Sequence, residues 1–295
     1  MMNKSPNFFC IGAQKAGTTS LYNILIQNPE IYLPRNKKEI HYFDYDRNYN
    51  KGLNWYFKKY FNNVKNEHAI GEITPSYSYF SHVPERIYND LGSDVKFIFI
   101  LRQPIDRAIS HYSMMTSRKE EEFTFLEAIE YEEQRLNSNQ IDSKKNYSYL
   151  NRGFYSKQLT NYYKFFDKDN ILLLSFEKEI KENLKETIIK IESFLGVKHI
   201  SYSNLHIASN ASDSQFKYKN LFKIKSNLKN IFPFLPQKIK SKINSIFFKK
   251  LPFKKFKIEE KENQRLLKKY YTQDINKLNE LTNCKFSYWL EYKSI

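Results

Sequence analysis

Short apolar runs alternate with amphipathic stretches along the first two thirds of the chain. Three runs have the length and composition of buried strands: Phe8–Ile11, Val95–Leu101 and Ile171–Leu174. Each is followed by a stretch in which apolar residues recur with helical spacing: Ser20–Gln27, Ile105–Met115 and Ile180–Leu195. Short strands that alternate with longer helices are typical of parallel βαβ units. The pattern therefore predicts a three-layer α/β domain, in which helices cover both faces of a central parallel sheet.

Turn residues indicate where these elements begin and end. Pro104 suits the first turn of the second predicted helix, and Gly196 suits the end of the third. A further helix is expected around Tyr155–Phe166. Because parallel sheets bind ligands at the carboxyl ends of their strands, the loops that follow Ile11 and Leu101 are where chemistry is expected.

Composition supports a packed protein with an anionic partner. The 295 residues include 24 Phe and 23 Tyr, which is ample material for a core, and the net charge is +16. Much of the excess lies in 217–257, which holds 13 lysines and no acidic residue. A field of this size attracts a nucleotide, an acidic glycan, a nucleic acid or a membrane surface.

The two cysteines, Cys10 and Cys284, form neither a disulfide framework nor a metal-ligand cluster. No window approaches the ~20 apolar residues of a membrane span, and Met1–Asn7 contains no apolar stretch. These features lead us to expect a cytoplasmic protein that needs no metal.

The loop after the first strand has the glycine spacing of a phosphate-binding loop. Gly12 and Gly17 are separated as in a Walker motif, but Thr18 stands where that motif has lysine, and the lysine is Lys15. Backbone N–H groups at a helix start, with nearby hydroxyls, can still hold a phosphate. The predicted phosphate ligands are Gln14, Lys15, Ala16, Gly17, Thr18 and Thr19.

A second phosphate ligand set follows the second strand. Arg102 lies in the loop after Leu101, and Ser110 lies two turns into the next helix. A guanidinium can bind a phosphate with two hydrogen bonds, and a serine hydroxyl can donate one more. The sequence therefore offers two phosphate subsites, each at a strand-to-helix turn.

Together these segments resemble the sulfotransferases that use 3′-phosphoadenosine 5′-phosphosulfate (PAPS). The resemblance rests on G-x-x-K-x-G-T-T from Gly12 and on R-x-P-x-x-R-x-x-S-x-Y, which this chain matches from Arg102 to Tyr112. It implies a P-loop-like sulfotransferase fold in one domain, 1–295. The parts of that domain are a core at 7–205, a lysine-rich variable segment at 206–257 and a helical segment at 258–295.

The resemblance also implies roles for individual residues. Lys15 would contact the oxygen that bridges phosphate and sulfate, and Arg102 with Ser110 would hold the 3′-phosphate. Tyr155, in Gly153-Phe154-Tyr155, would lie near the adenine, with plain core packing as its alternative. PAPS would be the donor, adenosine 3′,5′-bisphosphate (PAP) the product, and no metal would be required.

The segment Glu39-Ile40-His41-Tyr42-Phe43-Asp44 resembles the heparan sulfate N- and 3-O-sulfotransferase branch. That resemblance implies that Glu39 is the catalytic base, with His41 and Asp44 orienting it or touching the acceptor. Glu72, which follows the apolar run His68–Ile70, is a second candidate for the base or for acceptor binding. The sequence leaves the choice between Glu39 and Glu72 open.

We therefore predict sulfuryl transfer from PAPS to a hydroxyl or amine of a carbohydrate or another acceptor, by in-line displacement. Alternatives are a nucleotide-dependent kinase with an aberrant phosphate loop, and a basic module that binds nucleic acid or a membrane surface. The lysine-rich segment 217–257 is expected either to approach an anionic membrane or polymer or to be a solvated lid. A nucleic-acid partner is not favoured.

Overall fold

A computed structural model describes residues 5–137, 141–202, 205, 214–215, 251–252, 256–283 and 285–291. The chain forms two compact units. The first comprises Met1–Arg107, Leu150–Ala208 and Glu259–Ile295, and the second comprises Ala108–Tyr149 and Ser209–Ile258. Cys284 and nearly all of the lysine-rich segment lie outside the described residues.

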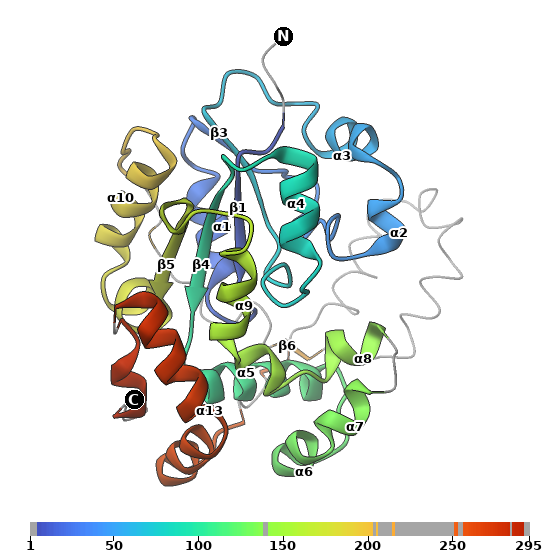
Figure 1. Ribbon diagram of the computed structural model, residues 1–295, viewed down its shortest axis with the longest axis vertical. Coiled ribbons are helices and arrows are strands. Elements are labelled where there is room, and N and C mark those ends of the chain that lie inside the picture. The colour runs from blue at the N-terminus through green and yellow to red at the C-terminus, as the bar shows by residue number, and fades with distance from the viewer. Residues whose placement is uncertain are drawn as a thin grey trace. The chain divides into compact units, whose positions relative to one another are not determined.

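The first unit contains a five-stranded sheet in the order β2-β3-β1-β4-β5 (Figure 1). Its strands are β1 (Phe8–Gly12), β2 (Ile31–Tyr32), β3 (Ala69–Ile73), β4 (Lys96–Leu101) and β5 (Ile171–Ser175). All neighbouring pairs are parallel, which confirms the predicted parallel sheet. The apolar runs predicted β1, β4 and β5. They did not predict β2, which is only two residues long, or β3, which includes Gly71 and Glu72.

The central strand, β1, lies where the chain changes direction across the sheet. Phe9 pairs with Glu72 of β3 on one side and with Phe97 of β4 on the other. The chain therefore continues from β1 toward one edge, and later crosses to β4 on the opposite side. A crevice at such a switch point, at the carboxyl ends of the strands, is the usual ligand site of an open α/β sheet.

Helices of the first unit follow most of the predicted stretches. They are α1 (Thr18–Leu25), α2 (Asp46–Tyr49), α3 (Leu53–Tyr60), α4 (Val83–Leu91), α9 (Tyr155–Tyr162), α10 (Leu184–Leu195) and α13 (Glu260–Thr282), with 3-10 turns at Asn151–Gly153, Lys168–Asn170 and Ser287–Leu290. Gly196 ends α10 in the left-handed conformation, as predicted. The helix expected over Ile180–Leu195 is divided, because a π-helix occupies Phe176–Glu182 before α10 begins.

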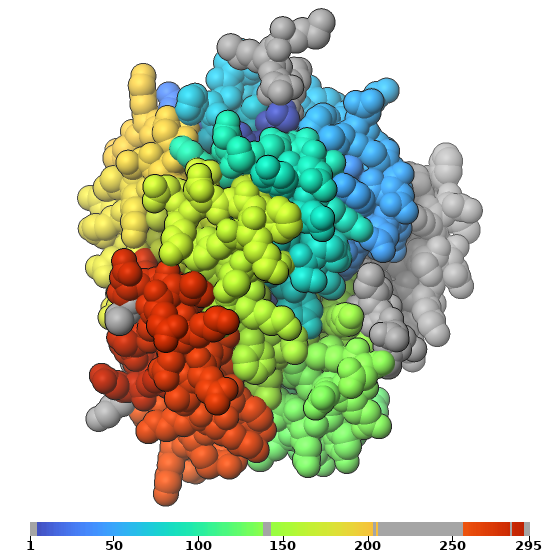
Figure 2. All heavy atoms as spheres, viewed as in Figure 1, coloured from blue at the N-terminus to red at the C-terminus, as the bar shows by residue number. Residues whose placement is uncertain are grey.

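Helix α9 links the sheet to the C-terminal helix. Its Tyr162 packs edge-on against Phe97 of β4, with ring centroids 5.1 Å apart. On the other side, the Ser156 hydroxyl donates to Asp274 of α13 at 2.5 Å, and the Tyr271 hydroxyl donates to the Leu150 carbonyl at 2.6 Å. Helix α13 packs against α9, and Figure 2 shows the red C-terminal segment beside the yellow-green one. The C-terminal helix therefore belongs to the same core as the sheet.

The second unit is mainly helical. Helix α5 (Pro104–Ser117) begins in the first unit and continues into the second, which also contains α6 (Phe125–Glu130), α7 (Glu132–Leu136), α8 (Ile141–Asn146) and the antiparallel pair β6 (Ser214–Gln215) and β7 (Leu251–Pro252). Glu121 accepts hydrogen bonds from Arg135 and Tyr149, which hold its pKa below the usual value despite burial. None of the helices that the structure describes is long and apolar enough to cross a membrane.

Candidate active site

The first phosphate loop connects β1 to α1 and bends at two left-handed residues. Gly17 precedes the helix with φ of 83°, and a Cβ there would lie 3.1 Å from the Phe176 ring. Lys15 has φ of 73°, which is uncommon for a residue with a side chain. The N-cap residue of α1 is Gly17, which has no side chain to cap the helix. The first N–H groups of α1 can therefore bind an anion.

Arg102 joins this loop to the loop after β4. Its Nη1 donates to the Lys15 carbonyl at 2.9 Å, and its guanidinium lies 4.8 Å from the centre of the Phe176 ring. Phe176 therefore supports both Gly17 and Arg102. The two loops that the sequence identified separately as phosphate sites are in direct contact, at the carboxyl ends of adjacent strands.

The predicted phosphate ligands differ in accessibility. Gln14, Lys15, Gly17 and Arg102 are partly exposed and Thr19 is exposed, whereas Ala16 and Thr18 are buried. Cationic side chains beside an uncapped helix start fit a phosphorylated nucleotide. Ser110, which the sequence grouped with Arg102, is partly exposed on α5 and belongs to the second unit.

Tyr155 differs from its predicted role at the nucleotide. Its side chain is 0% exposed, and its hydroxyl donates to the Arg102 carbonyl at 2.9 Å. Burial raises its pKa, so the hydroxyl stays protonated as a donor. Tyr155 supports the Arg102 loop from within the core, in line with the core-packing alternative.

Three residues that were not predicted support the loop that contains Arg102: Glu177, Asn263 and Trp289. Glu177 accepts from the Gln103 N–H at 2.9 Å and from the Trp289 indole at 3.2 Å, while the Gln103 side chain donates to Asn263 at 2.7 Å. Asn263 and Trp289 come from the C-terminal segment, more than 150 residues away from Gln103. No local signal in the sequence indicates these contacts.

On the acceptor side, the predicted residues Glu39, His41 and Asp44 form a connected group. The His41 Nδ1 lies 2.8 Å from an Asp44 oxygen, and its Nε2 lies 3.9 Å from a Glu39 oxygen. Asp44 is buried and also accepts from the Ser76 hydroxyl at 2.6 Å. Lys38 donates to the other Glu39 oxygen at 2.8 Å. The Glu39 side chain is 43% exposed and therefore accessible to an acceptor.

The backbone attaches Glu39 to the end of β3. Its N–H donates at 3.2 Å to the carbonyl of Ile73, the last residue of β3. Because β3 and β1 are parallel neighbours, their carboxyl ends lie at the same edge of the sheet. Glu39 and the Lys15 loop are therefore attached to adjacent strand ends, which is the arrangement that a base and a donor site require.

Glu72, the second candidate for the base, is buried. It lies inside β3 and is 1% exposed. Its oxygens accept from the hydroxyls of Tyr56 and of Thr74, the latter at 2.7 Å. Burial raises its pKa above the ordinary value of 4.5, and these hydrogen bonds partly offset the rise. Direct contact with an acceptor, which the sequence allowed, does not fit this position.

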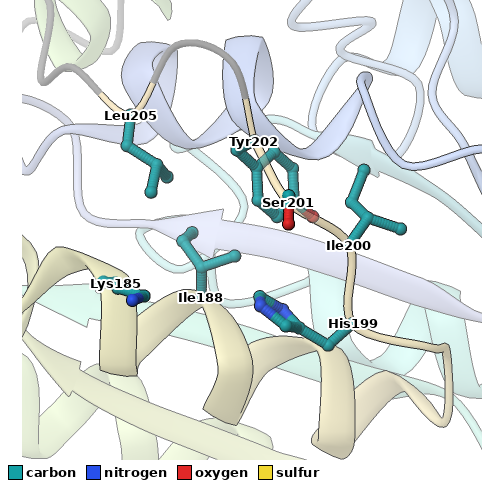
Figure 3. A pocket seen from close by; sticks show the side chains of 7 residues that line it. All are labelled: Lys185, Ile188, His199, Ile200, Ser201, Tyr202 and Leu205. Atoms are coloured by element: carbon teal, nitrogen blue, oxygen red, sulfur yellow. The ribbon is translucent and has the colours of Figure 1, made fainter.

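A pocket of about 400 Å³ lies beside α10, and it contains none of the predicted site residues (Figure 3). In that view His199 and Tyr202 lie opposite Ile188. Both polar side chains hydrogen-bond to the buried Glu192, at 2.5 Å each. These contacts attach the chain after α10 to the helix and explain the polar residues there as structural.

Among the residues that the structure describes, no three His, Cys, Asp or Glu side chains gather in a way that could hold a metal ion. Cys10 is buried in β1, and burial raises the pKa of its thiol to about 12, so the thiol stays protonated and unreactive at neutral pH.

Comparisons with known proteins identify several that are similar to this chain. The family model described as "Sulfotransferase domain" matches residues 5–225. Human heparan sulfate glucosamine 3-O-sulfotransferase 5 is 31% identical over 70% of this chain and 58% of its own length. The membrane-associated sulfotransferase kil1 of Dictyostelium discoideum is 38% identical, over 36% of this chain and 22% of its own length.

Solved structures have the same fold. A sulfotransferase from Alicyclobacillus acidocaldarius aligns with a TM-score of 0.69 at 23% identity, covering 97% of this chain and 98% of that one. Mouse sulfotransferase SULT7A1, complexed with PAP, aligns with a TM-score of 0.52 at 16% identity, covering 98% and 90%. The chain spans well under two thirds of the length of its heparan sulfate relatives.

Proposed function

Because this chain belongs to the sulfotransferase domain family, we propose that it transfers a sulfuryl group from PAPS to a hydroxyl or amine of a carbohydrate acceptor. The proposed reaction is an in-line displacement with Glu39 as the base. It forms an O–S or N–S bond to the acceptor, breaks the bond between sulfur and the bridging oxygen, and leaves PAP.

The observation that supports the proposal most strongly is the hydrogen bond from Arg102 to the Lys15 carbonyl. This bond joins the two predicted phosphate-binding loops into one site. A nucleotide with both a 3′- and a 5′-phosphate needs two phosphate subsites, one for each group. The phosphates of ATP form one linear group, so a nucleotide-dependent kinase does not need a second loop for a 3′-phosphate. The kinase alternative is accordingly not favoured.

In this account Lys15 stabilises the leaving group. Negative charge develops on the 5′-phosphate as sulfur departs, and a fixed ammonium with the N–H groups of α1 stabilises that charge. Because the charge is larger in the transition state than in the ground state, Lys15 acts mainly on turnover. Arg102 holds the 3′-phosphate and, through the Lys15 carbonyl, also fixes the lysine loop.

Glu39 removes the acceptor proton in this account. Its exposed carboxylate has an oxygen on the side of His41 and another bound by Lys38. The buried Asp44 holds the His41 ring through Nδ1, so that Nε2 faces Glu39. The His41–Asp44 pair therefore orients the group next to the base and can contact the acceptor itself.

The carbohydrate acceptor is supported by the names of the heparan sulfate relatives and by the +16 charge, which favours an acidic polymer. Contact of 217–257 with an anionic membrane or polymer stays a prediction, as does a cytoplasmic location. Vesicle binding by a variant with Lys→Gln changes in that segment, and fractionation of the producing cells, test these two points.

Binding to immobilised PAP tests the donor assignment. We expect the protein to be retained, to elute with free PAP, and to remain bound when ATP is added instead. Elution by ATP alone would favour the kinase. Salt-dependent binding to DNA or anionic lipid without nucleotide selectivity would favour the basic binding module.

A further inference from the structure

Glu72 is a buried acid for which the proposed reaction gives no direct role. A carboxylate in the interior costs free energy unless its hydrogen bonds offset the loss of water. Glu72 has hydroxyl donors around it: Tyr56 from α3 and Thr74, just after β3. Burial and the charge of Glu72 raise the pKa of a third hydroxyl, that of the buried Tyr77, which therefore keeps its proton. The surroundings of Glu72 are therefore arranged around its charge.

Two of these hydroxyls bind the loop that contains Glu39. The Thr74 oxygen accepts from the Ile40 N–H at 3.1 Å. The Tyr77 oxygen accepts from the N–H groups of Tyr42 and Phe43, at 2.9 and 3.3 Å. The Thr74 hydroxyl has only one proton, and donating it to Glu72 directs the oxygen lone pairs toward the Ile40 N–H. Glu72 thus sets the orientation of the Thr74 hydroxyl.

The loop needs such support because its backbone is strained on both sides of Ile40. Glu39 has φ of 60° and His41 has φ of 57°. Residues with side chains rarely adopt this conformation, and it persists only where the surrounding structure enforces it. The Ile40 N–H, bound to Thr74, lies between the two strained residues. Loss of that bond would allow both to relax and would move the Glu39 carboxylate.

We propose that Glu72 is a positioning residue, which acts through the Thr74 hydroxyl to hold the loop that presents Glu39 to the acceptor. The inference rests on the proposed function, in which Glu39 is the base. It assigns the two acidic residues different tasks: Glu39 meets the acceptor, and Glu72 remains in the core.

Substitutions of Thr74 test the link with a matched pair. Thr74→Val keeps the shape but removes the hydroxyl, so we expect kcat to fall on the order of tenfold. The KM for PAPS and the affinity for PAP should not change. Thr74→Ser keeps the hydroxyl and should retain most of the turnover. Thr187→Val is the control, because it removes another buried hydroxyl, one that donates to the carbonyls of Glu179 and Asn183.

A double substitution separates positioning from a general loss of packing. If Thr74 acts through Glu39, Thr74→Val should cost no further turnover when Glu39 is already Gln. Glu72→Gln should behave in the same way if it folds. Equal losses from Thr74→Val in both backgrounds, or a folded Glu72→Gln with normal kcat, would overturn the inference.

Amide hydrogen exchange provides a readout that does not depend on activity. Exchange at the Ile40 amide should become faster in Thr74→Val and in Glu72→Gln, and should stay unchanged in Thr187→Val. Unchanged exchange at this amide in both test variants would refute the positioning role. Faster exchange in a protein that transfers no sulfuryl group would instead refute the proposed function and leave the positioning role in place.

Discussion

The donor loops and the acceptor loop lie at the carboxyl ends of neighbouring strands, but different contacts hold them. On the donor side, Lys15 and Arg102 lie within a few residues of their strand ends, and their loops bind each other directly. On the acceptor side, Glu39 lies seven residues after β2 and is held by groups from β3 and the turn after it. Local turns build the donor loops, whereas a buried hydroxyl network builds the acceptor loop.

This difference predicts where substitutions act. Under the proposed function Lys15 and Arg102 contact the nucleotide, so their loss removes charge from the reacting centre. The proposed base, Glu39, depends on buried residues, so its activity can be lowered from the core.

The largest effect is expected for Lys15→Ala. Removing the ammonium eliminates the fixed charge beside the leaving 5′-phosphate, and we expect transfer to fall by ~1000-fold or to become undetectable. Circular dichroism should show a folded protein. Lys168→Ala, which changes an exposed lysine on the same unit, is the control. Normal turnover in Lys15→Ala would remove this residue from the donor site.

Glu39→Gln should have the next largest effect. The amide keeps the size of the side chain but removes its basicity, so turnover should fall by ~100-fold or more while PAP affinity stays near normal. Steady-state kinetics and calorimetry measure the two quantities. Glu85→Gln, at an exposed position on α4, should change neither. A Glu39→Gln protein with near-normal turnover would require a different base.

Arg102→Ala should weaken the donors selectively. PAPS and PAP have a 3′-phosphate that adenosine 5′-phosphosulfate lacks, so their affinities should fall much more than that of the latter compound. Because Arg102 also binds the Lys15 carbonyl, a smaller loss is expected for all three. Equal losses for the three nucleotides would mean that Arg102 only holds the loop.

The smallest effect is expected for Trp289→Phe. It keeps most of the buried ring but removes the donor to Glu177, which also binds the Gln103 N–H. We expect a loss of about 1 kcal/mol in the free energy of unfolding. PAP affinity should fall less than in Arg102→Ala, because the loop is only loosened. An affinity loss equal to that of Arg102→Ala would show that the C-terminal segment does more than support the loop.

The donor side and the central strands could be predicted from the sequence because their signals are local. Apolar runs gave β1, β4 and β5, and the glycines and Arg102 stand directly after two of them. The short β2 and the polar β3 were missed, since two residues have no periodicity and Glu72 interrupts the apolar pattern of β3.

Contacts between distant segments could not be predicted from the sequence. Asn263 and Trp289 reach the Arg102 loop across more than a hundred residues, and nothing beside them in the sequence indicates that partner. Tyr155 and Glu72 were predicted as site residues, but the sequence did not show that they are buried. Their burial depends on α13, α3 and the turn after β3, which pack around them. Residue type and spacing, together with the family resemblance, therefore predicted the candidate residues, and the tertiary fold determined which of them are buried.

The most direct test of the central claim is transfer of radiolabelled sulfuryl from PAPS to a carbohydrate acceptor. The purified protein is incubated with labelled PAPS and a panel of acidic glycans, and label in the polymer is measured beside the PAP formed. We expect labelled glycan in equal amount to PAP, with neither in Lys15→Ala. The proposed sulfuryl transfer would be contradicted if no glycan received label from PAPS while the protein transferred the γ-phosphate of ATP to those glycans.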